Sequence, residues 1–143
     1  MTETAAGRRT VPHTADLRVE AWAATREDCI AQAVLGAVES FVDIVSAHPT
    51  RTRRCRFPAE ADEDLLVDVL EEVVYLLDTA GEVPVDVEIE PVEEADGEVD
   101  VRFAMVDAAG LPQVGAVPKA VSLHELQLGR GPRGWRCSVT LDV

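Results

Sequence analysis

The sequence has 143 residues, a length that suits one compact domain with one hydrophobic core. Its 27 Asp and Glu residues against 13 Lys and Arg give a formal net charge of −14. This charge excludes a conventional nucleic-acid-binding protein, because Lys and Arg contacts to phosphate supply most of that affinity, and it disfavours docking on anionic lipid. Apolar residues make up 47% of the chain, which excludes a disordered acidic chain.

Nothing in the sequence points to export or to a membrane. The stretch Met1–Arg9 lacks the apolar centre of a signal peptide, and every apolar run is too short to cross a bilayer. The chain has three widely spaced cysteines, Cys29, Cys55 and Cys137. They form neither a CxxC motif nor an even-numbered framework, so we expect reduced, mostly buried thiols in a cytoplasmic protein.

The first part of the chain predicts an arm, a strand and a helix. Residues 1–10 are expected to form a flexible N-terminal arm, and residues 11–143 a single domain. Apolar and polar side chains alternate over residues 17–22, which predicts a half-buried strand. Thr25 is a suitable N-cap, and apolar residues recur after it at steps of three and four up to Phe41, so a helix follows with one face toward the core.

A short, strongly basic strand is predicted over residues 51–57. It contains four arginines, Arg51, Arg53, Arg54 and Arg56. Two interpretations are open. The segment can be an edge strand whose charges resist aggregation and neutralise nearby acids, or it can be a contact for a phosphate or an acidic partner.

The second helix is the strongest local prediction. Asp62 can cap it, Gly81 is a suitable C-terminal stop, and the apolar residues between them fall on one stripe. Its polar side is acidic and carries Asp64, Asp68, Glu71, Glu72 and Asp78. Such a face is either merely solvated or complementary to a basic partner, whose association it would steer.

Beyond Gly81 the apolar period changes from 3.6 to 2, which predicts four strands. Two of them, over residues 83–89 and 99–105, flank a turn at Asp96-Gly97, and two more cover residues 120–128 and 135–141. The predicted order is β-α-β-α-β-β-β-β. The expected fold class is α+β, with two amphipathic helices packed on a mixed, largely antiparallel sheet.

Motifs for nucleotide binding and nucleophilic catalysis are absent, and the three histidines have no metal-ligand spacing. The remaining candidate lies at the two ends of the domain. If the first and last strands end together, Asp16, Asp142 and the terminal carboxylate of Val143 form an all-oxygen cluster. Hard carboxylate oxygens favour Ca²⁺ or Mg²⁺ over Zn²⁺. The alternative is a capping Asp and an exposed terminus.

Four blocks of this sequence, in this order, resemble the archease family. They are His13–Asp16 before a strand, Phe41–Asp43 after the first helix, Leu65–Asp78 in the second helix, and Lys119–His124 before a closing strand that ends in Asp142-Val143. Together they span residues 11–143. Some positions depart from the family pattern: Pro12 stands where an acid often precedes the first block, and Ser122 and Leu123 replace a usual Thr and an aromatic residue.

The resemblance implies a small, non-catalytic, cytoplasmic protein that assists an RtcB-type, GTP-dependent RNA ligase in tRNA splicing or RNA repair. Such proteins promote guanylylation of the ligase and its multiple turnover. The expected partner is the ligase, with no direct binding to nucleic acid or membrane. The resemblance also implies a divalent metal, Ca²⁺ foremost and Mg²⁺ as an alternative, bound by Asp16, Asp142 and Val143. Residues with an outer-shell or partner-contact role would be His13, Lys119, His124, Asp64, Asp68 and Glu72.

Two other classes of function stay open from the residues alone. A metal-dependent hydrolase or transferase could use Asp16 and Asp142, although the sequence offers no evident nucleophile–base pair. A general chaperone-like module would need an exposed apolar patch.

Overall fold

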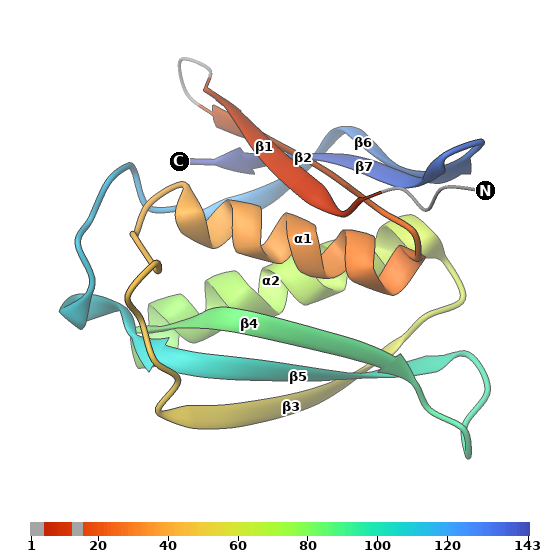
Figure 1. The fold of residues 1–143 in the computed structure, drawn as a ribbon, viewed down its shortest axis with the longest axis horizontal. Helices are drawn as coiled ribbons and strands as arrows, with labels where there is room; N and C mark the ends of the chain where they lie inside the picture. Colours follow the sequence, from red (N-terminus) through yellow and green to blue (C-terminus); the bar gives the residue numbers. More distant parts are fainter. Residues whose placement is uncertain (1–4, 13–15) are drawn as a thin grey trace.

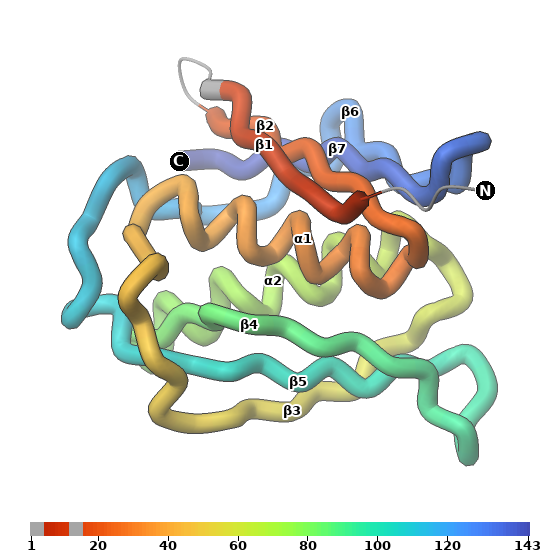
Figure 2. The backbone as a smooth tube through the Cα atoms, in the orientation of Figure 1, coloured from red at the N-terminus to blue at the C-terminus, as the bar shows by residue number. Residues whose placement is uncertain are grey.

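The computed structural model describes residues 5–12 and 16–143 and shows two helices enclosed between two antiparallel sheets (Figure 1). One sheet has four strands in the order β1-β2-β7-β6, and the other has three in the order β3-β5-β4. The backbone tube in Figure 2 shows the same three layers. The α+β class is therefore confirmed, but the single mixed sheet we expected is wrong, because every described strand pair is antiparallel and the strands divide into two sheets.

The elements have the following bounds. The four-stranded sheet consists of β1 (Gly7–Pro12), β2 (Asp16–Ala23), β6 (Ala120–Gly131) and β7 (Gly134–Asp142). The three-stranded sheet consists of β3 (Arg51–Pro58), β4 (Glu82–Pro91) and β5 (Glu98–Asp107). The helices are α1 (Arg26–Glu39), α2 (Asp62–Ala80) and a short 3₁₀ helix, η1 (Ala108–Gly110).

Local chemistry sets the ends of both long helices. The Thr25 side chain accepts a hydrogen bond from the Asp28 backbone N–H at 3.1 Å, which confirms the predicted cap of α1. At α2 the capping position is Ala61, so Asp62 begins the helix instead of capping it and contributes a favourable negative charge to its first turn. Gly81 ends α2 in the left-handed conformation, with φ of 67°, as its position predicted.

The core fills both helix–sheet interfaces. Helix α1 packs against β2 and β7 on one side and β4 on the other, so it is buried on more than one face. This explains its small residues, because a Cβ at Gly36 would lie 2.8 Å from Val19 Cγ1 of β2. The largest fully buried side chains include Ile30, Leu65, Leu66, Leu70, Phe103 and Met105.

One expected boundary is wrong. Residues 7–12 belong to strand β1, which pairs along its whole length with β2, so the expected flexible arm over residues 1–10 does not extend to Gly7. The strand lacks alternating apolar residues, and polar contacts of its arginines hold it to the rest of the fold instead. Arg8 contacts Glu39 and Gln32 of α1, and Arg9 Nε donates to Glu20 Oε1 at 2.8 Å.

Two further findings concern the cysteines and the membrane. All three cysteines are free thiols, with Cys29 and Cys137 buried and Cys55 half-buried, as predicted. In the part of the chain that the structure describes, no helix is both long and apolar enough to cross a membrane.

Candidate metal site

The two aspartates predicted to bind a metal face each other across a pair of strands. Strands β2 and β7 run antiparallel, and their register sets Asp16 directly opposite Asp142. Residues directly opposite share one face of a sheet, with Cβ atoms about 4.5–5.5 Å apart. Since Val19, Ala21 and Ala23 of β2 point into the core, the alternation turns Asp16 and its partner to the outer face. The hypothesis required the first and last predicted strands to end together, and the start of β2 does lie beside the end of β7.

Two other predicted residues lie beside this pair. Val143 is half-buried and follows Asp142 directly, so its Cα is about 3.8 Å from that of Asp142. Lys119 precedes β6, and its backbone N–H donates to the Asp142 carbonyl oxygen at 2.8 Å. Three separate segments of the chain therefore meet at one end of the four-stranded sheet.

The donor set at this end fits a hard cation better than a soft one. Asp16 and Asp142 offer carboxylate oxygens, and a terminal carboxylate at Val143 would be a third oxygen donor. Among the described residues, no group of three or more His, Cys, Asp or Glu side chains is arranged to hold a metal ion. The described side chains at this place thus offer two candidate ligands, and His13 lies outside the described residues.

His124 does not lie with the aspartates. It sits in an irregular segment of β6, where the register to β7 shifts between Ser122 and Gln127, and its side chain is 82% exposed. Its Nε2 is 3.5 Å from Glu125 Oε1, and Glu125 has a positive φ of 57°. The structure places this histidine on an exposed, irregular segment of β6, an edge strand of the sheet that holds the aspartate pair.

The acidic side of α2 carries the three predicted partner-contact residues. Asp64 is exposed, whereas Asp68 and Glu72 are half-buried. Burial, followed by the nearby charge of Glu72, raises the pKa of the Cys55 thiol on β3, which places Glu72 on the flank facing that strand. Asp64 and Asp68 lie seven residues before Glu71 and Tyr75, so they share with them the face of α2 that borders the cleft described next, whereas Glu72 lies nearer to β3.

The acidic side of α2 borders a surface cleft of about 550 Å³, which the sequence did not predict. It lies between α2 and the segment that leads into β6, and Lys119 lines its rim. Tyr75 contributes an exposed ring, 59% accessible. Glu71 and Asp78 make this rim acidic as well.

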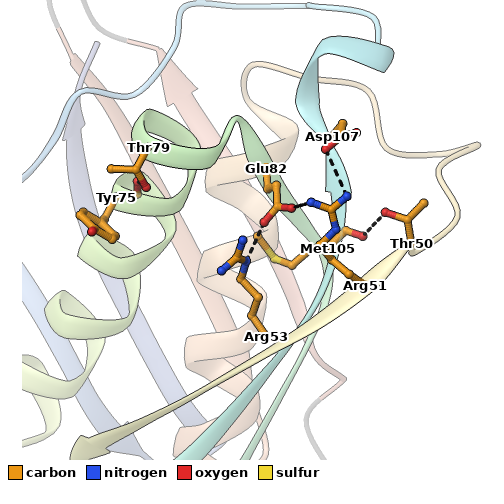
Figure 3. A network of polar contacts seen from close by, with 8 residues as sticks. All are labelled: Thr50, Arg51, Arg53, Tyr75, Thr79, Glu82, Met105 and Asp107. Atoms are coloured by element: carbon orange, nitrogen blue, oxygen red, sulfur yellow. Dashed lines mark hydrogen bonds and ion pairs between the residues drawn. The ribbon is translucent and has the colours of Figure 1, made fainter.

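The basic segment over residues 51–57 is an edge strand, as one of its two interpretations required. Figure 3 shows the contacts of two of its arginines, Arg51 and Arg53. Glu82 is completely buried, Arg53 Nε donates to its Oε1 at 2.6 Å, and Arg51 donates to its other oxygen. Arg51 also lies 3.8 Å from Asp107. Two of the four arginines thus neutralise an internal acid.

The fold and this end of the sheet define a small α+β protein in which two sheets enclose two helices and two aspartates meet on paired strands. A family model described as "Archease protein family (MTH1598/TM1083)" matches residues 9–143. The chain therefore belongs to the archease family.

Individual relatives agree with this assignment. A "Probable protein archease" of Mycobacterium tuberculosis is 64% identical over 140 residues, covering 98% of this chain and 76% of that protein. A "Protein archease" of Archaeoglobus fulgidus is 29% identical, covering 94% and 98% of the two chains.

Two solved structures share the fold. The solution structure of protein 1598 of Methanobacterium thermoautotrophicum has a TM-score of 0.76 at 22% identity and covers 96% of this chain and 99% of that one. The crystal structure of an archease of Thermotoga maritima, titled "possible chaperone", has a TM-score of 0.66 at 20% identity, with coverage of 94% and 96%.

Proposed function

We propose that this chain is a non-catalytic, cytoplasmic activator of an RtcB-type RNA ligase, which it helps to become guanylylated and to turn over repeatedly. Its membership of the archease family supports the proposal. The observation that carries it is the pairing of Asp16 with Asp142 across β2 and β7, because two carboxylates on one sheet face are held in place by backbone pairing rather than by mobile loops.

The proposed metal ligands are Asp16, Asp142 and the terminal carboxylate of Val143, with Ca²⁺ as the first choice and Mg²⁺ as the second. A bound divalent cation would neutralise these carboxylates and offer its remaining coordination positions to oxygen atoms of the partner. The chain's own part is to fix the ligands. The β2–β7 register holds the two aspartates, and the Lys119–Asp142 backbone hydrogen bond ties the third segment to them.

The proposed role of α2 is to guide the encounter with the ligase. An RNA ligase must bind a polyanion, so its surface near the active site is basic, and an acidic helix complements it. Complementary charge acts mainly on the association rate. Reversing Asp64, Asp68 and Glu72 to Lys should slow association several-fold, and more so at low salt. Unchanged association kinetics at low ionic strength would mean that these three carboxylates only face solvent.

The deciding experiment measures ligated RNA formed per ligase molecule, with this protein added well below the ligase concentration. We expect many more turnovers with the protein than without it. Equal product in both arms would overturn the proposal. A third arm contains the protein with RNA ends and nucleotides but no ligase, and turnover there would identify an enzyme instead of an activator.

Variants of the aspartate pair connect activation to the metal. Asp16→Asn and Asp142→Asn should each weaken Ca²⁺ binding by tenfold or more in calorimetric titration and should abolish activation. The matched control is Glu90→Gln, which removes an exposed carboxylate from the other sheet. Equal Ca²⁺ affinity in both Asn variants and the parent would remove the site.

A tag on the chain end tests Val143 separately. A short C-terminal extension converts the terminal carboxylate into an amide and places new residues beside Asp142. We expect weaker Ca²⁺ binding and loss of activation, with the folded structure retained. An extension at Met1 is the control, and unchanged affinity in the C-terminally extended protein would exclude the terminal carboxylate as a ligand.

A further inference from the structure

The four-stranded sheet carries positive charge in a molecule that is otherwise strongly acidic. Its strands and the turn at residues 132–133 hold six arginines, Arg8, Arg9, Arg18, Arg130, Arg133 and Arg136. The same segments hold four acids, Asp16, Glu20, Glu125 and Asp142. The net charge of the chain is −14, so this excess of two positive charges is a local reversal of sign.

The outer face of this sheet concentrates that charge around one carboxylate. Opposite residues on β1, β2 and β7 share a face, and Arg9, Glu20 and Ser138 form one such row. A hydrogen bond from Arg9, together with the charges of Arg9, Arg18 and Arg136, lowers the pKa of Glu20. Three guanidinium groups therefore act on a single acid. Among the described residues, the buried Nε of Arg18 has no hydrogen-bond acceptor.

A cleft of about 420 Å³ opens at the β6–β7 hairpin, at the opposite end of β7 from Asp142. It is lined by Trp22, Gly131, Pro132, Arg133, Gly134, Trp135 and Arg136. This lining contains both tryptophans of the chain, two arginines and no acid. Its size is within the range of small-molecule pockets.

The indole of Trp22 is held in place by its two neighbouring strands. Gly7, Trp22 and Arg136 lie opposite one another on β1, β2 and β7. The ring lies so close to Gly7 that a Cβ there would come within 2.5 Å of it. On the other strand, the Arg136 guanidinium carbon is 5.9 Å from the ring centroid. The guanidinium is thus held over the indole ring before any ligand arrives, which lowers the ordering cost of binding.

We infer that this cleft binds one nucleotide unit of a single-stranded nucleic acid, with a phosphate at Arg133 and Arg136 and the base against the indole surface. Guanidinium groups match phosphate oxygens in charge and geometry. Stacking of bases on aromatic side chains is the usual means of holding single strands without sequence preference. An acidic peptide would use the arginines but would gain nothing from the tryptophans, so the combination favours a nucleotide.

The net charge of −14 predicts that the molecule as a whole does not bind nucleic acid, and this cleft is a local exception. The strongly acidic remainder of the chain would repel an extended strand, which limits the contact to one or two nucleotides. The affinity should therefore be modest and useful mainly when another protein holds the rest of the strand. This proposal rests on the hairpin cleft alone and does not depend on the metal site or on a ligase.

The test uses the intrinsic fluorescence of the two tryptophans, since both line the cleft. The full chain, without ligase, is titrated with a short single-stranded RNA, with inorganic phosphate and with an oligoglutamate peptide of equal charge. We expect saturable quenching with RNA at the lowest concentration of the three. Affinity should fall with salt with a slope of about −0.7 to −1.4 on logarithmic axes, the value for one to two phosphates. Absence of quenching by RNA, or equal affinity for the peptide or for phosphate, would overturn the nucleotide assignment.

Matched variants separate the cleft from general charge. Arg133→Ala and Arg136→Ala should each weaken RNA binding about tenfold, because each removes a charge-assisted contact to phosphate. Arg54→Ala and Arg56→Ala remove the same charge from exposed positions on β3 and should change affinity less than twofold. Trp22→Phe keeps an aromatic ring and should bind more weakly than the parent but more strongly than Arg136→Ala. Equal losses in the β3 variants would overturn the proposal.

Because the titration contains no ligase, its failure would leave ligase activation untouched. Conversely, a protein that binds RNA in the cleft but does not raise ligase turnover would overturn only the proposed function. The two outcomes are therefore distinguishable.

Discussion

Two arginine-rich regions of this molecule use their charge in opposite ways. On β3, Arg51 and Arg53 converge on Glu82, a carboxylate that is completely buried. At the β6–β7 hairpin, Arg133 and Arg136 have no ion-pair partner among the described residues, and Arg136 lies beside the Trp22 ring. The denser cluster in the sequence is partly used inside the fold, while the sparser one faces solvent. The availability of a cation depends on where the acids lie, which the spacing of arginines does not reveal.

The largest loss of stability should come from leaving the buried Glu82 carboxylate without its arginine partners. The double change Arg51→Ala and Arg53→Ala leaves the Glu82 carboxylate buried without a cation, which should cost about 3–5 kcal/mol of unfolding free energy. Urea denaturation measures it. Arg54→Ala with Arg56→Ala is the control, since these side chains are exposed, and should change stability by no more than about 0.5 kcal/mol. If both pairs cost the same, Glu82 does not need these arginines.

Removing the acid instead of its partners should cost less. Glu82→Gln keeps the shape of the side chain and leaves Arg51 and Arg53 without their carboxylate. These arginines are 46% and 41% exposed, so water can solvate them, and a loss of about 1–2 kcal/mol is expected. Comparing the two denaturation midpoints tests the asymmetry. A larger loss for Glu82→Gln than for the double arginine variant would contradict it.

The acid at the centre of the cationic face should show a smaller, pH-dependent effect. Because the pKa of Glu20 is lowered from 4.5, its stabilising contribution is complete above about pH 4.5 and is lost as the pH falls through the folded value. Glu20→Gln should therefore flatten the pH dependence of stability in the acidic range. The same variant removes the one acid among the three arginines, so it should strengthen RNA binding. Denaturation curves from pH 3 to 6 and the fluorescence titration measure the two effects, and weaker RNA binding would argue against the cationic face.

The smallest change in stability should come from the exposed arginine of the hairpin turn. Arg133→Ala should leave the unfolding free energy within about 0.5 kcal/mol of the parent, because its side chain is exposed in a two-residue turn. Thermal denaturation is sufficient to measure this. A loss of 2 kcal/mol or more, on the order of a buried ion pair, would mean that this arginine is structural, like those that hold Glu82.

Local features of the fold could be predicted from the sequence, and long-range ones could not. Thr25 and Gly81 act within one helical turn, so their roles were visible in the sequence. Strand β1 was missed because ion pairs from Arg8 and Arg9 replace apolar alternation. The division into two sheets was missed because strand partners are chosen at long range, as between β3 and β5.

In the candidate sites, too, the sequence predicted the local chemistry but not the contacts between distant segments. The chemistry of Asp16 and Asp142 could be argued from the sequence, but their meeting depended on a strand pairing that only the structure supplies. The hairpin cleft was missed because Trp22 and Arg136 are remote in sequence and adjacent only through the β2–β7 register. One signal was available, since residues 129–136 contain three arginines and a tryptophan without any acid.

The pairing of β2 with β7 also determines when, during folding, the two candidate sites form. Strand β2 is made early on the ribosome, yet its central partner is the last strand of the domain. Until β7 emerges, β2 lacks its hydrogen-bonding partner on one side. Contacts of such long sequence separation also form slowly. The aspartate pair and the tryptophan–arginine cleft both straddle this same seam. Both candidate sites should therefore appear together, in the final folding step, and a chain truncated before β7 should have neither.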